Sequence, residues 1–275
     1  MKGTLSRILA IAQRWVAAAA AAMPAFFAAA GGAQAMAGAP PLRIAAASDL
    51  QFALPEIAAA FKAESGIAVR SSFGSSGNLM RQIMAGAPFD IFLSADEAYA
   101  QRLIAAGDAR GPGLIYAAGR LVLLLPKDSP LRLDPTLDDL RAALGDGRLG
   151  RFAIANPAHA PYGMRARDVL RRAGLWEAIA PHLVYGENVA QAAQFALSGA
   201  AAGGIVAYSL ARAPGIDARA RSVLLPADRH RPLRQRAVLT ALAPPAAARF
   251  LGFLASPTAR RILARYGFTL PREGS

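Results

Sequence analysis

FGSSGNLMRQI, residues 73–83, joins an expected strand to an expected helix. Ser75 or Ser76 falls at the N-cap, where a side-chain oxygen accepts a hydrogen bond from a free backbone N–H. Hydroxyl and backbone N–H donors therefore converge at the positive end of the helix dipole, which suits an anion. Taken alone, these residues indicate an ordinary capped helix, so the case for an anion site depends on the rest of the chain.

The first 37 residues have the layout of a secretory signal peptide. A basic start precedes an alanine-rich apolar run and two small-residue sites, which predict cleavage after Ala35 or Ala37. An uncleaved membrane anchor is the alternative, but the run is short and Pro24 interrupts it. We therefore expect an exported protein, with no later segment long and apolar enough to span a bilayer.

Charge and cysteine content narrow the function. The formal net charge is +13, which favours an anionic partner. The arginines are scattered, with no basic run interleaved with aromatic residues, so nucleic-acid binding is not expected. The chain has no cysteine, which excludes thiol catalysis and thiolate metal sites and argues against a lipid anchor on a cleavage-site cysteine.

Strand and helix patterns alternate along the chain in two blocks. Strands are expected at 42–47, 67–73 and 89–93 in the first block, and at 120–126, 152–155, 183–186 and 204–208 in the second. Strands at 223–226 and 236–242 and two helices, 245–254 and 257–266, close the chain. Alternation of this kind predicts an α/β fold in which each block forms a mixed, mostly parallel sheet flanked by helices.

Two such blocks predict two lobes with a ligand cleft between them. We expect lobe 1 to comprise 42–119 plus 236–275, and lobe 2 to comprise 120–235. In open parallel sheets, ligands bind beyond the carboxyl ends of the strands, and small ligands are common between domains. The polar helix starts that follow strands in the two blocks are Ser48-Asp49, Ser75-Ser76, Tyr162-Gly163 and Asn188-Val189.

The sequence contains no recognisable pattern of catalytic residues. His159, His182 and His230 are far apart, lack metal-ligand spacing and are expected on the surface or in loops. A nucleophile elbow and a P-loop are both absent. What remains is a set of neutral donors at helix starts, which suits a fully ionised oxyanion because its oxygens only accept hydrogen bonds. We expect no enzyme, no cofactor and no metal site apart from such an oxyanion.

Six motifs carry a resemblance to a known family. They are AAASDL at 45–50, SSFGSSGNLMRQI at 71–83, GAPFDIFLSAD at 86–96, NPAHAPYG at 156–163, GENVAQAAQF at 186–195 and RYGF at 265–268. In these motifs the chain resembles the periplasmic molybdate-binding proteins of ABC transporters over essentially the whole mature sequence. The resemblance implies a type II periplasmic binding protein, in which two lobes close over molybdate or tungstate and deliver it to a membrane permease, and we expect a monomer.

The resemblance also implies the residues that bind the oxyanion. Ser48 would supply hydroxyl and backbone contacts, Asp49 its backbone N–H, and Ser76 its hydroxyl and N–H. Ser75 replaces Ser76 if the register is shifted by one residue. Tyr162 and Val189 would supply backbone N–H groups from lobe 2, and in some members the tyrosine hydroxyl also contributes.

Two side chains depart from the family pattern. Asp49 places a carboxylate beside an anion, so we expect it to turn away and cap the following helix. Tyr208 stands one position later than a ligand tyrosine of some members, which on a strand turns it to the opposite face, so we expect a core residue.

Two alternatives stay open. One is a protein of the same fold that binds sulfate, phosphate or an organic carboxylate, the last of which would need an arginine in the cleft. The other is an exported enzyme, which would need a histidine–acid pair there.

Overall fold

The computed structural model describes residues 40–271, and the expected signal peptide lies outside them. The sheet of lobe 1 has the order β2-β1-β3-β10-β4. Its strands are β1 (Leu42–Ala47), β2 (Val69–Gly74), β3 (Ile91–Ser94), β4 (Ala109–Gly119) and β10 (Leu233–Thr240). β2 and β3 run parallel to β1, whereas β10 pairs antiparallel with both β3 and β4.

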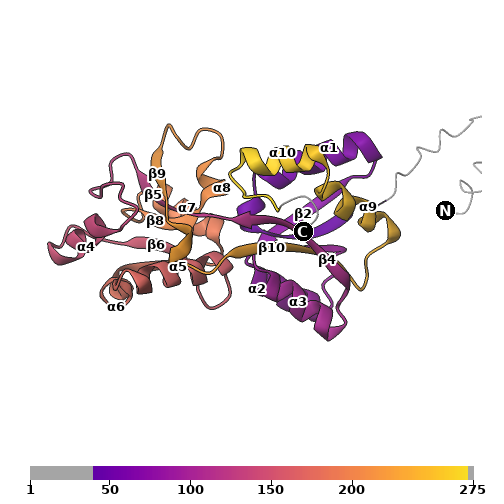
Figure 1. Ribbon diagram of the computed structural model, residues 1–275, viewed down its shortest axis with the longest axis horizontal. Coiled ribbons are helices and arrows are strands. Elements are labelled where there is room, and N and C mark those ends of the chain that lie inside the picture. The colour runs from indigo at the N-terminus through magenta and orange to yellow at the C-terminus, as the bar shows by residue number, and fades with distance from the viewer. Residues whose placement is uncertain (1–39, 272–275) are drawn as a thin grey trace, which may run out of the picture. The chain divides into compact units, whose positions relative to one another are not determined.

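Helices cover both faces of this sheet. Successive side chains of a strand point to opposite faces, and the buried residues of β1 pack against helices on both. Ile44 and Ala46 of β1 face a core formed with α1 (Ala53–Ser65), α9 (Pro245–Leu254) and α10 (Pro257–Arg265). Ala45 faces the opposite core, formed with α2 (Ser76–Met84) and α3 (Glu97–Ala106). In Figure 1, α1 and α10 accordingly lie above the sheet of lobe 1, and α2 and α3 lie below it.

Lobe 2 repeats this arrangement, with the order β7-β6-β8-β5-β9. Its strands are β5 (Leu121–Pro126), β6 (Phe152–Ala155), β7 (Leu183–Gly186), β8 (Gly204–Ala207) and β9 (Ala220–Leu224). Its helices are α4 (Asp138–Gly145), α5 (Pro161–Arg172), α6 (Trp176–Ile179), α7 (Val189–Leu197) and α8 (Tyr208–Ala211). β7 and β8 run parallel to β6, and β5 pairs antiparallel with β8 and β9. Both sheets are mixed, as predicted, but they are not mostly parallel, because β10 in lobe 1 and β5 in lobe 2 each make two antiparallel pairings.

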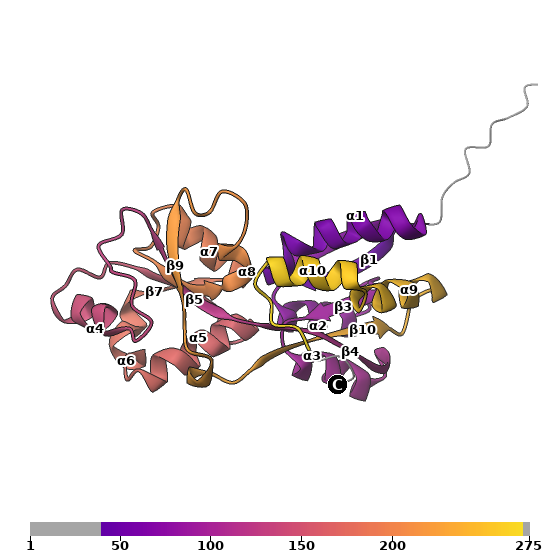
Figure 2. The ribbon, with the colours of Figure 1, turned by 45° about the horizontal axis from the view of Figure 1, so that its top comes forward.

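The chain passes between the lobes twice, from β4 into β5 and from β9 into β10 (Figures 1 and 2). At the first passage, a Cβ on Gly119 would lie 2.1 Å from the hydroxyl oxygen of Tyr162. A larger residue at position 119 would therefore require the side chain of Tyr162 to move or the lobes to separate. The predicted lobe boundaries at 119–120 and 235–236 stay a prediction, and β10 already begins at Leu233.

Two expectations about the elements were wrong. No strand was predicted at 109–119, yet β4 occupies these residues and pairs with β10 through an irregular register. The helix expected directly after Ser48-Asp49 begins only at Ala53, since residues 48–50 form a 3-10 turn without a side-chain cap. None of the helices in the described residues is long and apolar enough to cross a membrane.

Candidate functional site

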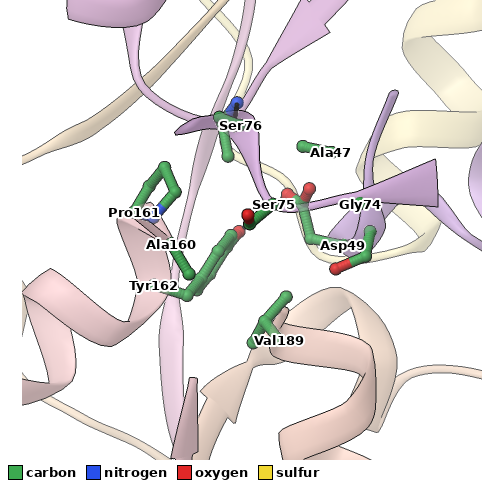
Figure 3. A pocket seen from close by; sticks show the side chains of 11 residues that line it. Ala47, Asp49, Gly74, Ser75, Ser76, Ala160, Pro161, Tyr162 and Val189 are labelled. Atoms are coloured by element: carbon green, nitrogen blue, oxygen red, sulfur yellow. Dashed lines mark hydrogen bonds between the residues drawn. The ribbon is translucent and has the colours of Figure 1, made fainter. Parts of the chain in front are cut away.

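A small cavity lies where strand ends of the two lobes meet (Figure 3). All five residues predicted to contact the ligand line it: Ser48, Asp49, Ser76, Tyr162 and Val189. The remaining lining residues are Ala47, Gly74, Ser75, Ala95, Ala160 and Pro161. The structure thus brings the predicted residues of both lobes together, while their role toward a ligand stays a prediction.

Ser76 is fully buried on the lobe 1 wall as the first residue of α2. Its Oγ accepts a hydrogen bond from the backbone N–H of Ala95 at 3.0 Å. Because that bond uses a lone pair, the hydroxyl proton of Ser76 is free to donate into the cavity. The backbone N–H at this helix start also lacks an intrahelical partner.

Ser75 is the N-cap of α2 and is engaged elsewhere. Its Oγ accepts from Asn78 N at 3.4 Å and lies 2.8 Å from Nδ1 of His159 in lobe 2. The other ring nitrogen, Nε2, lies 3.6 Å from a carboxylate oxygen of Glu187. In the tautomer with the proton on Nε2, Nδ1 accepts from the Ser75 hydroxyl. The Ser75 hydroxyl is then committed to His159, which favours Ser76 as the donor to a ligand.

The position of His159 was predicted only in part. It lies in a loop, as predicted, but it is buried between the lobes rather than at the surface. Its backbone carbonyl also accepts from Gly77 N at 3.0 Å. The sequence signal for this role is weak, because a histidine in a turn-rich loop is ordinarily exposed.

Two helix starts of lobe 2 face the same cavity. Pro161 is the first residue of α5 and has no N–H, so Tyr162 supplies the first free backbone donor of that helix. Val189 is the first residue of α7, whose N-cap Asn188 accepts from Ala190 N and Gln191 N. Ala190 N also lies 3.3 Å from the Oγ of Ser48, which links α7 to lobe 1.

The expectation that Asp49 caps a helix was wrong. Its side chain is buried, and Oδ2 accepts from the Tyr162 hydroxyl at 2.9 Å and from Nε2 of Gln235. Burial raises the pKa of this carboxyl to about 6, although the hydrogen bonds from Gln235 and Tyr162 oppose the rise. A helix cap was not available, because the turn at residues 48–50 separates Asp49 from the start of α1.

Gln235 was not anticipated from the sequence. It lies on β10 between Leu233 and Ala237, which share its face and are buried like it. A polar side chain within such an alternating apolar face is the signal that could have identified it.

Tyr208 does not line the cavity. The strand argument applied to it was wrong, because β8 ends at Ala207 and Tyr208 begins α8. Its ring is half-buried against the lobe 2 core and packs against the backbone of Gly267. A packing role for Tyr208 is therefore consistent with the expectation, although the reason differs.

A further pair of side chains joins the lobes beside the cavity. Arg165 of α5 donates to Asp96, the N-cap of α3, with Nη2 to Oδ2 at 2.6 Å. Its Nη1 also donates to Asp168 at 3.1 Å. No sequence pattern predicted this pair, because the partners lie far apart along the chain.

Within residues 40–271, Asp49 is the one charged residue that lines the cavity, and no arginine or lysine does so. Among the described residues there is also no cluster of His, Asp and Glu that could hold a metal ion. The cavity thus presents neutral donors, which favours a small oxyanion and disfavours a carboxylate clamped by arginine.

Residues 42–269 match the family model described as bacterial extracellular solute-binding protein. The chain belongs to this family. Among its relatives, this solute-binding protein is 38% identical to the molybdate-binding protein ModA of Rhodobacter capsulatus, over 78% of this chain and 82% of that one. It is 36% identical to the molybdate-binding protein ModA of Escherichia coli K12, over 83% and 89% of the two chains.

A solved structure supports the same relationship. The periplasmic molybdate-binding protein of Azotobacter vinelandii superposes with a TM-score of 0.76 at 31% identity, covering 84% of this chain and all of that one. The two-lobed fold with helices flanking two mixed sheets is therefore the fold of this solute-binding protein. Both ModA relatives are named as molybdate-binding proteins.

Proposed function

We propose that this solute-binding protein captures molybdate, and also tungstate, in the periplasm and delivers it to the permease of an ABC transporter. The observation that carries the proposal is the cavity itself, where free donors from helix starts of both lobes converge without a cation. The relatives named as molybdate-binding proteins support the same ligand.

Within this proposal, each wall supplies its own donors. Ser48 and Ser76 donate from their hydroxyl groups, and Ser76 and Asp49 add backbone N–H groups. Tyr162 and Val189 donate backbone N–H groups from lobe 2. Hydrogen bonds to a charged partner contribute about 1.5–3 kcal/mol each, so several of them are enough for micromolar or tighter binding after closure.

Binding proceeds without chemistry. The lobes open about the two connections at β4–β5 and β9–β10, the oxyanion docks on the helix starts, and closure removes it from water. The donors suit sulfate as well as molybdate, so we attribute selectivity to the size of the closed cavity. The mature protein acts as a monomer that contacts the permease.

A catalytic alternative rests on three residues in the order of a catalytic triad. The Ser75 hydroxyl lies near one ring nitrogen of His159, and the other ring nitrogen lies near the Glu187 carboxylate. We infer no catalysis from them. The distance from Nε2 to the Glu187 carboxylate is 3.6 Å, beyond a hydrogen bond, and that carboxylate is 68% exposed. Ser75 also caps α2.

A panel of oxyanions in a thermal-shift assay tests the proposed ligand. Molybdate and tungstate are expected to raise the melting temperature of the mature protein, because a ligand that binds only the folded state stabilises it. Sulfate, phosphate and small carboxylates are expected to raise it much less at equal concentration. An equal rise with sulfate would point to the alternative ligand.

Ser76→Ala is expected to weaken molybdate binding by about tenfold or more, since one charge-assisted hydrogen bond is lost. The melting temperature of the ligand-free protein should change little. Ser198→Ala, at an exposed residue after α7, is the matched control and should bind as the wild type does. Unaltered affinity in Ser76→Ala would remove Ser76 from the site.

A further inference from the structure

The Asp49 carboxyl has two oxygen atoms in different environments. Oδ2 accepts from the Tyr162 hydroxyl at 2.9 Å and from Nε2 of Gln235. Oδ1 is buried and makes no hydrogen bond of normal geometry among the described residues, although the backbone N–H groups of Asp49 and Leu50 lie near the carboxyl and lower its pKa. An unpartnered carboxyl oxygen on the wall of a small cavity is costly unless a ligand or a proton engages it.

The donors to Oδ2 hold the carboxyl in one orientation. The Tyr116 hydroxyl donates to Oε1 of Gln235 at 2.7 Å, which turns the amide nitrogen of Gln235 toward Asp49. The Ser209 hydroxyl donates to the backbone carbonyl of Asp49 at 2.8 Å. This network leaves Oδ1, rather than Oδ2, as the oxygen able to take a proton.

No cation compensates this carboxyl among the residues that line the cavity. The titratable groups that face it are the phenols of Tyr162 on α5 and Tyr116 on β4, and the pKa of each is raised well above its usual value by burial and by Asp49 itself. Gly74 and Val189, the lining residues from β2 and α7, carry no titratable group. An ionised Asp49 carboxylate would therefore repel a bound dianion, because no nearby cation compensates either negative charge.

We propose that Asp49 takes up one proton on Oδ1 when the dianion binds, and that the resulting neutral carboxyl donates a hydrogen bond to the ligand. The proton comes from solvent, and only an O–H bond forms. This role for the side chain rests on the proposed function and adds to the backbone contact assigned to Asp49 above. It makes oxyanion capture a proton-coupled event.

The direction of the pH dependence follows. Burial places the pKa of Asp49 at about 6 with the cavity closed, and a neighbouring dianion raises it further. Below the pKa of Asp49 in the ligand-free protein the carboxyl is already neutral, so the affinity should not change with pH. Above it, each binding event requires a proton, so the affinity should fall with rising pH by up to tenfold per pH unit.

Calorimetric titration of the mature protein with molybdate tests the proposal. Titrations at pH 7.5 in buffers of different ionisation enthalpy report the number of protons taken up. The wild type is expected to take up close to one proton, and Asp49→Asn none. The affinity of Asp49→Asn should be independent of pH between 6.5 and 8.5, and about a hundredfold or more tighter than that of the wild type at the upper end.

Ser76→Ala is the control, since it should bind more weakly and still take up the proton. Absence of proton uptake by the wild type would overturn the proposal without using any variant. Wild-type uptake by a folded Asp49→Asn would also overturn it, because the proton would then reside elsewhere. Absence of any binding heat with molybdate would instead refute the proposed function.

Discussion

Gly77→Ala is expected to weaken molybdate binding by more than about tenfold without destabilising the ligand-free protein. Gly77 is the second residue of α2 in lobe 1, and its N–H donates to the His159 carbonyl of lobe 2 at 3.0 Å. A Cβ at residue 77 would lie 2.7 Å from that carbonyl oxygen and 3.1 Å from His159 Cα. These are backbone atoms, so the lobes themselves would have to stay further apart.

The physical reason for the large effect is that lobe separation weakens several ligand contacts at once. Donors on the two walls would no longer reach one oxyanion together, and the loss of a single such hydrogen bond already corresponds to about 1.5–3 kcal/mol. Alanine is a better helix former than glycine, so α2 itself should not be harmed. Isothermal titration and thermal melting of the same sample measure the two effects.

Gly252→Ala is the matched control for this substitution. Gly252 also lies in a helix, α9, but a Cβ there would meet nothing within 4 Å. It should bind molybdate as the wild type does. Wild-type affinity in Gly77→Ala would contradict the view that the contact between α2 and the His159 loop forms as the lobes close on the ligand.

Arg165→Met is expected to weaken molybdate binding by about tenfold to a hundredfold. Arg165 and Asp96 join the two lobes, with side chains that are 4% and 12% exposed. Removal of one partner from a buried pair costs about 3–5 kcal/mol. We discount that range because Asp96 and Asp168 keep some access to water. We expect both partners to be solvated in the open protein, so the loss should appear in the affinity rather than in the stability of the ligand-free form.

Asp96→Asn removes the charge of residue 96 but keeps its ability to cap α3. Oδ1 of Asp96 accepts from Ala98 N at 3.0 Å, and asparagine caps a helix about as well as aspartate. Asp96→Asn should therefore lose affinity while α3 is retained. The double variant should lose less than the two single losses together, because both remove one interaction.

Arg132→Met is the control for a pair that does not join the lobes. Arg132 bonds Asp139 within lobe 2, and its side chain is 84% exposed, so the pair should contribute about 0–1 kcal/mol. Its loss should leave molybdate affinity unchanged. Equal affinities for Arg165→Met and the wild type would exclude the Arg165–Asp96 pair as a contact of the closed form.

Much of the fold was predictable because hydrophobic periodicity reports burial directly. β1, β6 and β7 have the predicted bounds, and α9 spans the predicted residues 245–254. β4 was not predictable from its own residues. Gly111 and Gly113 adopt positive φ within it, and its pairing with β10 comes from the tertiary structure rather than from local propensity.

Part of the candidate site was likewise predictable from the sequence, and part was not. Ser76, Tyr162 and Val189 begin helices that follow strands, so local sequence and the fold class together predicted that they meet. The surroundings of Asp49 were missed because its partners, Tyr162 and Gln235, come from the other lobe and from a distant strand. Contacts of this kind depend on how the chain returns between the lobes, which periodicity does not report.

Selective binding of molybdate in the cavity between the lobes is the central claim. Isothermal titration of the purified mature protein with molybdate, sulfate and phosphate tests it most directly. We expect one molybdate per chain with a dissociation constant of about 1 μM or tighter, and sulfate and phosphate binding at least about a hundredfold weaker, a difference of about 2.7 kcal/mol. Sulfate or phosphate binding as tight as molybdate binding, or no molybdate binding, would contradict it.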